Sequence, residues 1–325
     1  MLNTLGRAPE TEVSSTFEAT HSLSIIRIDQ FSTTADMTNK PGLTERLANI
    51  LFGKKHFRLA QPVGVLADNP DMLCVTDQLA GIILIDRSRG KFELPKADKY
   101  EVLPSPVGIC RGHNDAIFIT DSKLEKVFKL EGDSNKRKIL GDGILLSRPT
   151  GILYESMKRQ AWVVETGAHR ISVLDSAGNR VKVLGSRGTG PGEFNFPTFI
   201  CAGADGTIYI VDSMNFRVQL FSNDGEFIGM FGEGGDATGY LARPKGIATD
   251  SYGHIYLVDG LFHAVQVFDK EGNFLYTFGS QGNGDGEFWL PVGIHIDDHD
   301  RIYVADSYNS RIQIFQLISN AADKN

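Results

Sequence analysis

The chain contains few cysteines and no long apolar run. Its 325 residues include three cysteines, Cys74, Cys110 and Cys201, which lie far apart and form no C-x-x-C pair. This spacing indicates neither a disulfide framework nor a haem-attachment motif. No stretch reaches the roughly 18 consecutive apolar residues that a membrane-spanning helix needs, so we expect no transmembrane segment.

Basic residues are also fewer than acidic ones. The chain has 33 lysines and arginines against 40 aspartates and glutamates, which gives a formal net charge of −7. Nucleic acids and anionic membranes favour clustered basic side chains, so we expect neither as a general partner. The start of the chain lacks the basic and then apolar pattern of a secretory signal. We expect residues 1–23 to form an extended or disordered segment.

Glycine, by contrast, is abundant, and one stretch of the chain recurs. The segment GEFNFPTFICAGADGTIYIVDSMNFRVQLF, residues 192–221, returns twice downstream at intervals of 47 residues. The same register continues upstream and gives six copies, each 43 to 48 residues long. The anchor prolines are Pro62, Pro106, Pro149, Pro197, Pro244 and Pro291, and the anchor acids are Asp77, Asp121, Glu165, Asp212, Asp259 and Asp306. A fixed period of this size indicates a repeat architecture.

Each copy has the pattern of four short strands. In the fourth copy, residues 199–202, 207–211, 217–221 and 226–231 are rich in β-branched and aromatic residues, and Gly and Asp mark the turns between them. No apolar set recurs at helical spacing. Six copies of four strands predict an all-β, six-bladed β-propeller with four antiparallel strands per blade. Cys74 falls at a core position that is aromatic in the other copies, so we expect it to be buried.

The last copy ends after its third strand. The isolated run Ser24–Phe31 is the natural donor of the missing strand, because pairing there would close the ring and remove two exposed sheet edges. Residues 41–52 have the pattern of a short helix. We therefore divide the chain into the segment 1–23, a closing strand and helix over 24–60, a propeller over 61–317, and a polar tail over 318–325.

Four motifs place the chain near a known family. The copies combine P-x-G-[IV], I-Y-V-x-D, D-x-x-N-x-R and F-G-x-x-G-x-G-x-G-E-F, most completely in copies four to six. This combination resembles the NHL repeat family, over about residues 61–317. The resemblance implies a six-bladed propeller. Stand-alone bacterial proteins of this kind are mostly exported, which implies a periplasmic or cell-surface location, although the compartment stays open.

An acid and an arginine five residues later recur around the ring. We interpret these pairs as structural bridges that fix the loop of each blade, because a functional pair would not need repetition. The glycine runs between copies lack the Lys and the helix of a phosphate-binding loop, so we interpret them as connectors. The structural pairs are Asp212 with Arg217, Asp306 with Arg311, and Glu165 with Arg170.

The fourth residue after the anchor proline suggests a metal site. Cys110, Cys201 and His295 occupy this position on alternate copies, and Cys₂His is a known zinc set. Zinc needs its ligand atoms at about 2.0 to 2.3 Å. Short side chains on separate innermost strands of a six-bladed ring would hardly reach one ion at the axis. We therefore favour packing, and expect no metal and no cofactor.

Large side chains gather in the loops on one face. Propeller ligands commonly bind on the face that carries the interblade connectors and the loops between second and third strands, and apolar residues there suggest a contact patch. We predict a binding face formed by Met214, Phe216, Phe262, His263, Trp289 and Tyr308.

These patterns favour a non-catalytic binding or scaffolding propeller. We expect a monomer that binds a protein partner or small ligand through the loop face, without nucleic acid. One alternative is a metal-dependent lyase or lactonase that uses the central channel, although His295 is the only histidine at the innermost-strand position compared above. The other is an RNA-binding NHL domain, which the negative net charge disfavours.

Overall fold

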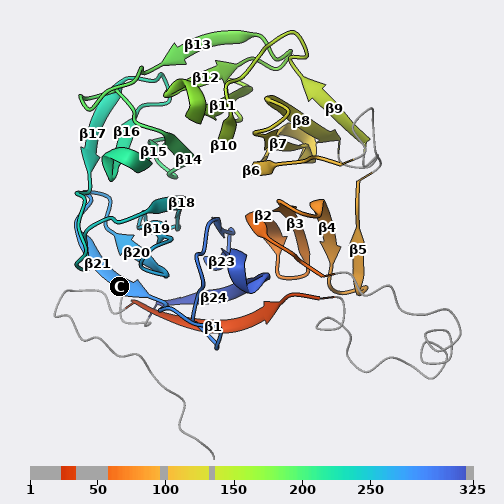
Figure 1. Ribbon diagram of the computed structural model, residues 1–325, viewed down its shortest axis with the longest axis vertical. Helices are drawn as coiled ribbons and strands as arrows, with labels where there is room; N and C mark the ends of the chain where they lie inside the picture. Colours follow the sequence, from red (N-terminus) through yellow and green to blue (C-terminus); the bar gives the residue numbers. More distant parts are fainter. Residues whose placement is uncertain (1–22, 34–57, 96–101, 132–135, 320–325) are drawn as a thin grey trace, which may run out of the picture.

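The computed structural model describes residues 23–33, 58–95, 102–131 and 136–319. These residues form six four-stranded antiparallel sheets, arranged as blades around a central axis (Figure 1). The fold is therefore the six-bladed propeller that the repeats predict. In the part of the chain that the structure describes, no helix has the length and apolar character needed to cross a membrane. The predicted helix at 41–52 lies outside the described residues.

Each blade takes its strands in chain order, from the axis outwards. Blades 1 to 3 consist of β2 (Pro62–Asn69), β3 (Met72–Asp77), β4 (Gly81–Asp86) and β5 (Lys91–Glu93); β6 (Pro106–Arg111), β7 (Ile117–Asp121), β8 (Lys126–Glu131) and β9 (Lys136–Leu140); and β10 (Pro149–Glu155), β11 (Gln160–Glu165), β12 (Arg170–Leu174) and β13 (Arg180–Leu184). Blades 4 and 5 consist of β14 (Pro197–Ala202), β15 (Ile208–Asp212), β16 (Arg217–Phe221) and β17 (Phe227–Phe231); and β18 (Pro244–Thr249), β19 (Ile255–Asp259), β20 (Ala264–Phe268) and β21 (Phe274–Phe278).

Blade 6 is built from both ends of the described chain. It contains β22 (Ile294–Ile296), β23 (Arg301–Asp306) and β24 (Arg311–Ser319), and its outer strand is β1 (Leu23–Phe31). β1 pairs antiparallel with β24 along its length, from Leu23 opposite Ser319 to Phe31 opposite Ile312. The predicted closure of the ring by an N-terminal strand is therefore confirmed, and β24 continues two residues beyond the predicted end of the propeller.

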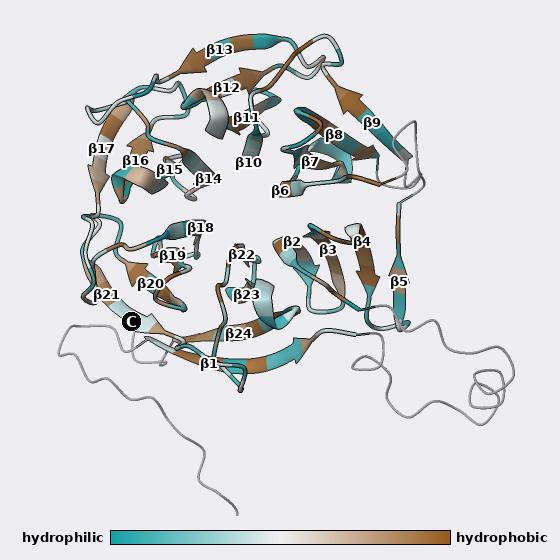
Figure 2. Ribbon diagram, viewed as in Figure 1, coloured by the Kyte–Doolittle hydropathy of each residue, from teal (hydrophilic) through white to brown (hydrophobic). Residues whose placement is uncertain are grey.

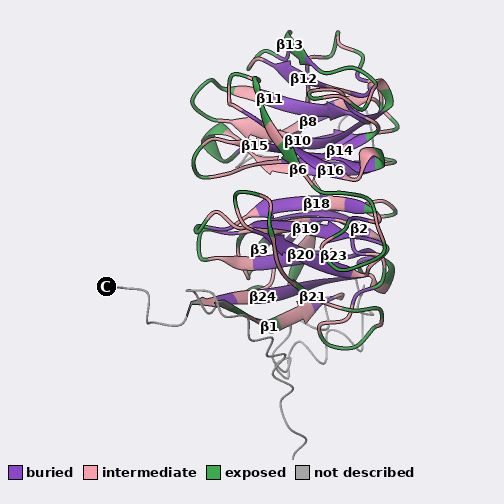
Figure 3. Cartoon of the chain, turned by 90° about the vertical axis from the view of Figure 1, so that its left-hand side faces the viewer, coloured by how far each residue is buried: buried purple, intermediate pink, exposed green. Residues whose placement is uncertain are grey.

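The core lies between adjacent blades. Side chains of the middle strands alternate between the two faces of each sheet and fill six apolar clusters. Apolar residues are concentrated in these strands in Figure 2, and Figure 3 shows the same strands buried while exposed residues follow the loops. The aromatic position of the repeat holds Trp162, Tyr256 and Tyr303, each no more than 1% exposed. Cys74 occupies it in blade 1 and is buried, as predicted.

Hydroxyl groups link neighbouring blades beside the axis. Thr76 donates a hydrogen bond to the carbonyl of Val107 in the next blade (2.8 Å), and Ser213 does the same to Pro244 (2.7 Å). Corresponding bonds run from Thr120 to Thr150, Thr166 to Pro197, and Ser307 to Pro62. Blade 5 has Val258 and Gly260 at the two equivalent positions, so among the described residues it is the blade without this link.

Backbone crowding explains the glycine two residues after the anchor proline. A Cβ atom on Gly108 would lie 2.1 Å from the carbonyl oxygen of Thr150 in the next blade, and one on Gly246 would lie 2.5 Å from that of Val292. Blade 4 departs from the pattern with Phe199, whose side chain packs against the cluster between blades 4 and 5. The innermost strands therefore approach each other too closely for side chains at most of these positions.

Candidate ligand site at the channel mouth

The repeated acid and arginine pairs form buried ion pairs. Arg217 Nε lies 2.8 Å from Asp212 Oδ2, and Arg311 Nε lies 2.7 Å from Asp306 Oδ2. The other guanidinium nitrogens of these two arginines donate to backbone carbonyls of the preceding connector, such as that of Glu193. These charges are therefore neutralised inside the blades and hold the connectors in place.

Blade 3 contains a related pair. Arg170 Nε lies 2.9 Å from Glu165 Oε1, and Arg180 contributes a second cation at 3.1 Å. Burial acts to raise the pKa of Glu165, but hydrogen bonds from Arg170 and Ser172 outweigh it, so this pKa lies below its ordinary value. The carboxylate therefore stays ionised, and its partners come from its own blade.

The three candidate metal ligands do not gather. Burial raises the pKa of the Cys110 thiol to about 12 and that of Cys201 further, which keeps both protonated and poor as ligands. His295 Nε2 lies 3.0 Å from the carbonyl oxygen of Ala67, and burial lowers its pKa. In the described segments, no three His, Cys, Asp or Glu side chains form a group able to hold a metal ion.

Two of the six predicted binding residues come together. The rings of Trp289 and Tyr308 lie 6.5 Å apart and are 48% and 57% exposed, respectively. Met214 is exposed on the loop after β15. The other members are more enclosed.

The remaining predicted residues support the loops. Phe216 packs against the cluster between blades 4 and 5, and Phe262 is half-buried. The Nδ1 atom of His263 accepts a hydrogen bond from the backbone of Leu290 at 3.0 Å, as His169 does from Phe196. These contacts show that the histidine side chain braces the connector that enters the next blade.

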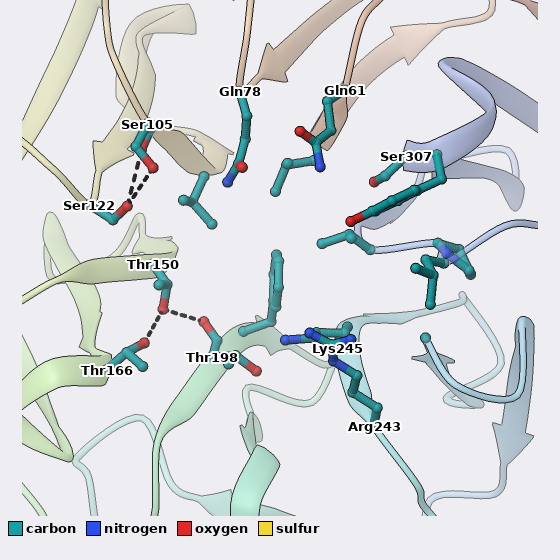
Figure 4. Close-up of a pocket in the computed structure, with 18 of the residues that line it drawn as sticks. Gln61, Gln78, Ser105, Ser122, Thr150, Thr166, Thr198, Arg243, Lys245 and Ser307 are labelled. Carbon is teal, nitrogen blue, oxygen red and sulfur yellow. Dashed lines mark hydrogen bonds between the residues drawn. The ribbon is translucent and has the colours of Figure 1, made fainter.

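A cavity of about 420 Å³ opens on the same face. Every blade contributes to it through equivalent positions: the residues on either side of the anchor proline and the residue after the anchor acid. We call this cavity the channel mouth. Figure 4 shows its polar side chains converging from Gln61, Gln78, Ser105, Thr150, Arg243 and Lys245, among others. Tyr308 of the aromatic pair also lines it.

Three cations and no acid line the channel mouth. The cations are Arg148 of blade 3 and Arg243 and Lys245 of blade 5, and the other described lining residues are neutral. Burial lowers the pKa of Lys245 to about 8, and repulsion from Arg243 and then Arg148 adds to the effect, while Asp259 opposes it. The mouth is therefore a local excess of positive charge in a chain of negative net charge.

The sequence contains a signal for this site that does not involve aromatic residues. Alignment on the anchor prolines places Val63, Val107, Thr150, Thr198, Lys245 and Val292 at one position. Lysine is the only charged residue in that set, and it stands on the strand nearest the axis. A departure from the repeat at an axial position would have identified Lys245.

Comparisons with known proteins agree with this architecture. Residues 194–221 match the NHL repeat model, and residues 246–322 match a family described as a 6-bladed beta-propeller. No curated protein sequence matches the chain.

Several solved structures have a similar fold. A virginiamycin B lyase from Staphylococcus aureus is 15% identical, with a TM-score of 0.58 over 91% of this chain and 100% of that one. A gluconolactonase from Xanthomonas campestris is 14% identical, with a TM-score of 0.61 over 80% and 86%. An auxiliary nutrient binding protein from Bacteroides thetaiotaomicron is 14% identical, with a TM-score of 0.64 over 82% and 71%. At these identities the likeness concerns the fold. With its repeats, its family matches and its ring of six blades, the chain is a six-bladed β-propeller in which one copy matches the NHL repeat.

Proposed function

We propose that this propeller is a non-catalytic binding protein that holds a small ligand in the channel mouth. The observation that carries the proposal is the cavity of about 420 Å³ on the loop face, to which all six blades contribute. Ligand sites are typically concave spaces of about 300 to 1,000 Å³ with a few convergent polar groups. The channel mouth has this size and this chemistry.

The surroundings of the cavity support binding through the loop face. Trp289 and Tyr308 are exposed at its edge, and aromatic side chains of this kind are enriched where proteins meet their partners. Scaffolding of a protein partner through this rim is compatible with a ligand in the cavity. The proposal thus narrows the predicted binding face from six residues to the mouth and the aromatic pair beside it.

Two alternatives have less support. A metal-dependent lyase or lactonase needs a set of metal ligands, and the described lining residues include no histidine, aspartate or glutamate. An RNA-binding surface needs many phosphate contacts along a basic track, whereas the mouth has three cations in one cavity. Lyase and lactonase activities are properties of the lyase and gluconolactonase to which the fold is similar.

A cavity-filling variant tests the proposal. A Cβ atom on Gly260 would lie 3.5 Å from Pro291 O and 3.8 Å from Arg243 Cδ, so Gly260→Leu projects among the lining residues without a backbone clash. Gly229 on the outer strand β17 has open space around it, and Gly229→Leu is the matched control. We expect compounds from a library of neutral and charged metabolites to raise the melting temperature of the wild type and the control.

The expected difference lies in the Gly260→Leu protein, which should lose these shifts while keeping its own fold by circular dichroism. Compounds that stabilise Gly260→Leu as strongly as the wild type bind elsewhere, and that result would overturn the assignment of the site. Turnover of a lactone or cyclic peptide by the wild type would instead favour the enzymatic alternative.

A further inference from the structure

We infer that the channel mouth selects a small polar organic anion, whose carboxylate or phosphoryl group binds to Lys245, Arg243 and Arg148. The inference rests on the proposed function, since it names the ligand class of the same cavity. The evidence comes from the pairing of charges across the molecule, the neutral groups opposite the cations, and a gap in blade 5.

The three cations of the mouth differ from the repeated arginines of the blades. Arg217 and Arg311 are buried in ion pairs within their own blades. The side chains of Arg148, Arg243 and Lys245 make no ion pair or hydrogen bond with any residue that the structure describes. Cations that stay unpaired in a shared cavity repel each other, and a bound anion would relieve that repulsion.

The acid that acts on Lys245, Asp259, is already engaged in hydrogen bonds. Asp259 is fully buried and accepts hydrogen bonds from the backbone N–H groups of Ala242, Arg243, Leu261 and Phe262. Its blade has Ala264 where blades 4 and 6 have the partner arginine. Asp259 therefore offsets part of the positive charge of Lys245, although it forms no ion pair with it. The arginine that pairs with the anchor acid in blades 4 and 6 is missing from blade 5.

Neutral hydrogen-bonding groups face the cations across the cavity. In Figure 4, the amides of Gln61 and Gln78 point into the mouth from blade 1, opposite Arg243 and Lys245. Neither amide makes a side-chain hydrogen bond with the described residues. The lining hydroxyl of Thr150, by contrast, is already engaged, because it donates to the carbonyl of Thr198. The amides are thus available for hydroxyl or carbonyl groups on the uncharged part of a ligand.

Blade 5 leaves room beside its two cations. The residue after the anchor acid is Ser307 in blade 6 and Ser213 in blade 4, and each hydroxyl bridges to the next blade. Blade 5 has Gly260 there, with no atom closer than 3.5 Å to the place of a Cβ. The missing side chain opens the cavity next to Arg243. Space and unpaired charge therefore coincide in the same blade.

Titration calorimetry tests the inference with defined probes. Glucose 6-phosphate, citrate and inorganic phosphate supply phosphoryl and carboxylate groups, and glucose is the neutral counterpart of the first. The variants are Lys245→Met and Arg243→Gln. Lys270→Met is the matched control, because Lys270 is exposed on a hairpin turn and its ion pair among the described residues is with the adjacent Glu271. Circular dichroism verifies that each variant is folded.

We expect at least one anionic probe to bind the wild type and Lys270→Met, and glucose to bind neither. Loss of one charged hydrogen-bonding partner should weaken binding at least about tenfold in Lys245→Met and in Arg243→Gln. Binding to the wild type should also weaken from pH 7 to pH 9, as Lys245 loses its proton near its pKa of about 8. The Lys245→Met protein should lack this pH dependence.

Other outcomes separate the inference from the proposed function. Anions that bind equally to the wild type and to both variants would overturn the inference. It would also be wrong if no anionic probe bound while neutral compounds bound and were excluded by Gly260→Leu, and the proposed function would then stand. If no anionic probe bound and Gly260→Leu still bound every compound that the wild type binds, both the inference and the proposed function would be wrong.

Discussion

Blades 5 and 6 share a sequence pattern but differ where a ligand could be bound. Blade 6 has the full set of structural side chains, with Arg311 paired to Asp306 and Ser307 bonded across the blade boundary. Blade 5 has Ala264 and Gly260 at those two positions, and places Arg243 and Lys245 beside the axis instead. The difference shows that the unpaired cations of the channel mouth lie mainly in the copy that departs from the structural pattern of its neighbours.

The largest expected effect comes from breaking blade 6 at its closing strand. Deletion of residues 1–31 removes β1 and exposes the edge of β24, which pairs with it. We expect the deleted protein to lose its cooperative unfolding transition and to aggregate, as measured by calorimetry and light scattering. A soluble, cooperatively melting product would contradict the role of β1 in the ring.

The same substitution in the two blades should have unequal effects. Asp306→Asn leaves Arg311 buried without its counter-charge, and we expect a loss of about 3 kcal/mol in the free energy of unfolding. Asp259→Asn breaks no ion pair with an arginine. It weakens hydrogen bonds from backbone N–H groups and removes a negative charge that acts on Lys245, at a cost of about 1 kcal/mol. Urea unfolding measures both. Equal losses would show that the two blades are held together in the same way.

Lys245→Met should stabilise the protein in the absence of ligand. Because burial lowers the native pKa of Lys245 from 10.5 to about 8, the folded state binds fewer protons than the unfolded state between these values. The cost is therefore fully present below pH 8 and disappears as the pH approaches 10.5. We expect a gain of about 1 kcal/mol at pH 7, allowing for partial solvation.

The pH profile provides the check on that prediction. Urea unfolding from pH 7 to pH 10 should show the wild type gaining stability relative to Lys245→Met, so that the difference between the two proteins becomes smaller as the pH rises. If the difference in the free energy of unfolding between the two proteins stayed constant over this range, packing and not the charge of Lys245 would cause it.

The smallest expected effect comes from restoring the missing hydroxyl of blade 5. Gly260→Ser supplies the side chain that Ser307 provides in blade 6, within reach of the carbonyl oxygen of Pro291. We expect a gain of less than about 1 kcal/mol in stability, together with weaker binding of anionic probes. Thermal melting and calorimetry measure the two quantities. Unchanged binding would show that the gap at Gly260 has no part in the site.

Most of the fold was accessible from sequence because the same constraints recur. The anchor prolines and acids predicted six blades, and the isolated run Ser24–Phe31 predicted the closing strand. The pairing of Asp212 with Arg217 also followed from repetition. Each of these features depends on contacts within a blade or between neighbours, which the register fixes.

The candidate site was harder to predict, because its parts meet only when the ring is closed. Tyr308 is an exposed loop aromatic, whereas Phe216 and His263 look similar in sequence but face the supporting structure. Arg148 and Lys245 are separated by nearly 100 residues. Their mutual repulsion, and the lowered pKa of Lys245, arise from burial that no local pattern encodes.

The pairing of β1 with β24 also has a consequence for how the protein is made. A ribosome produces β1 before the other strands of the propeller and β24 after them, so blade 6 stays incomplete until β24 has been synthesised. Ser307, which bridges from blade 6 to Pro62 of blade 1, is likewise added late. All six blades line the channel mouth, so the mouth is complete only after β24 has been made and has paired with β1.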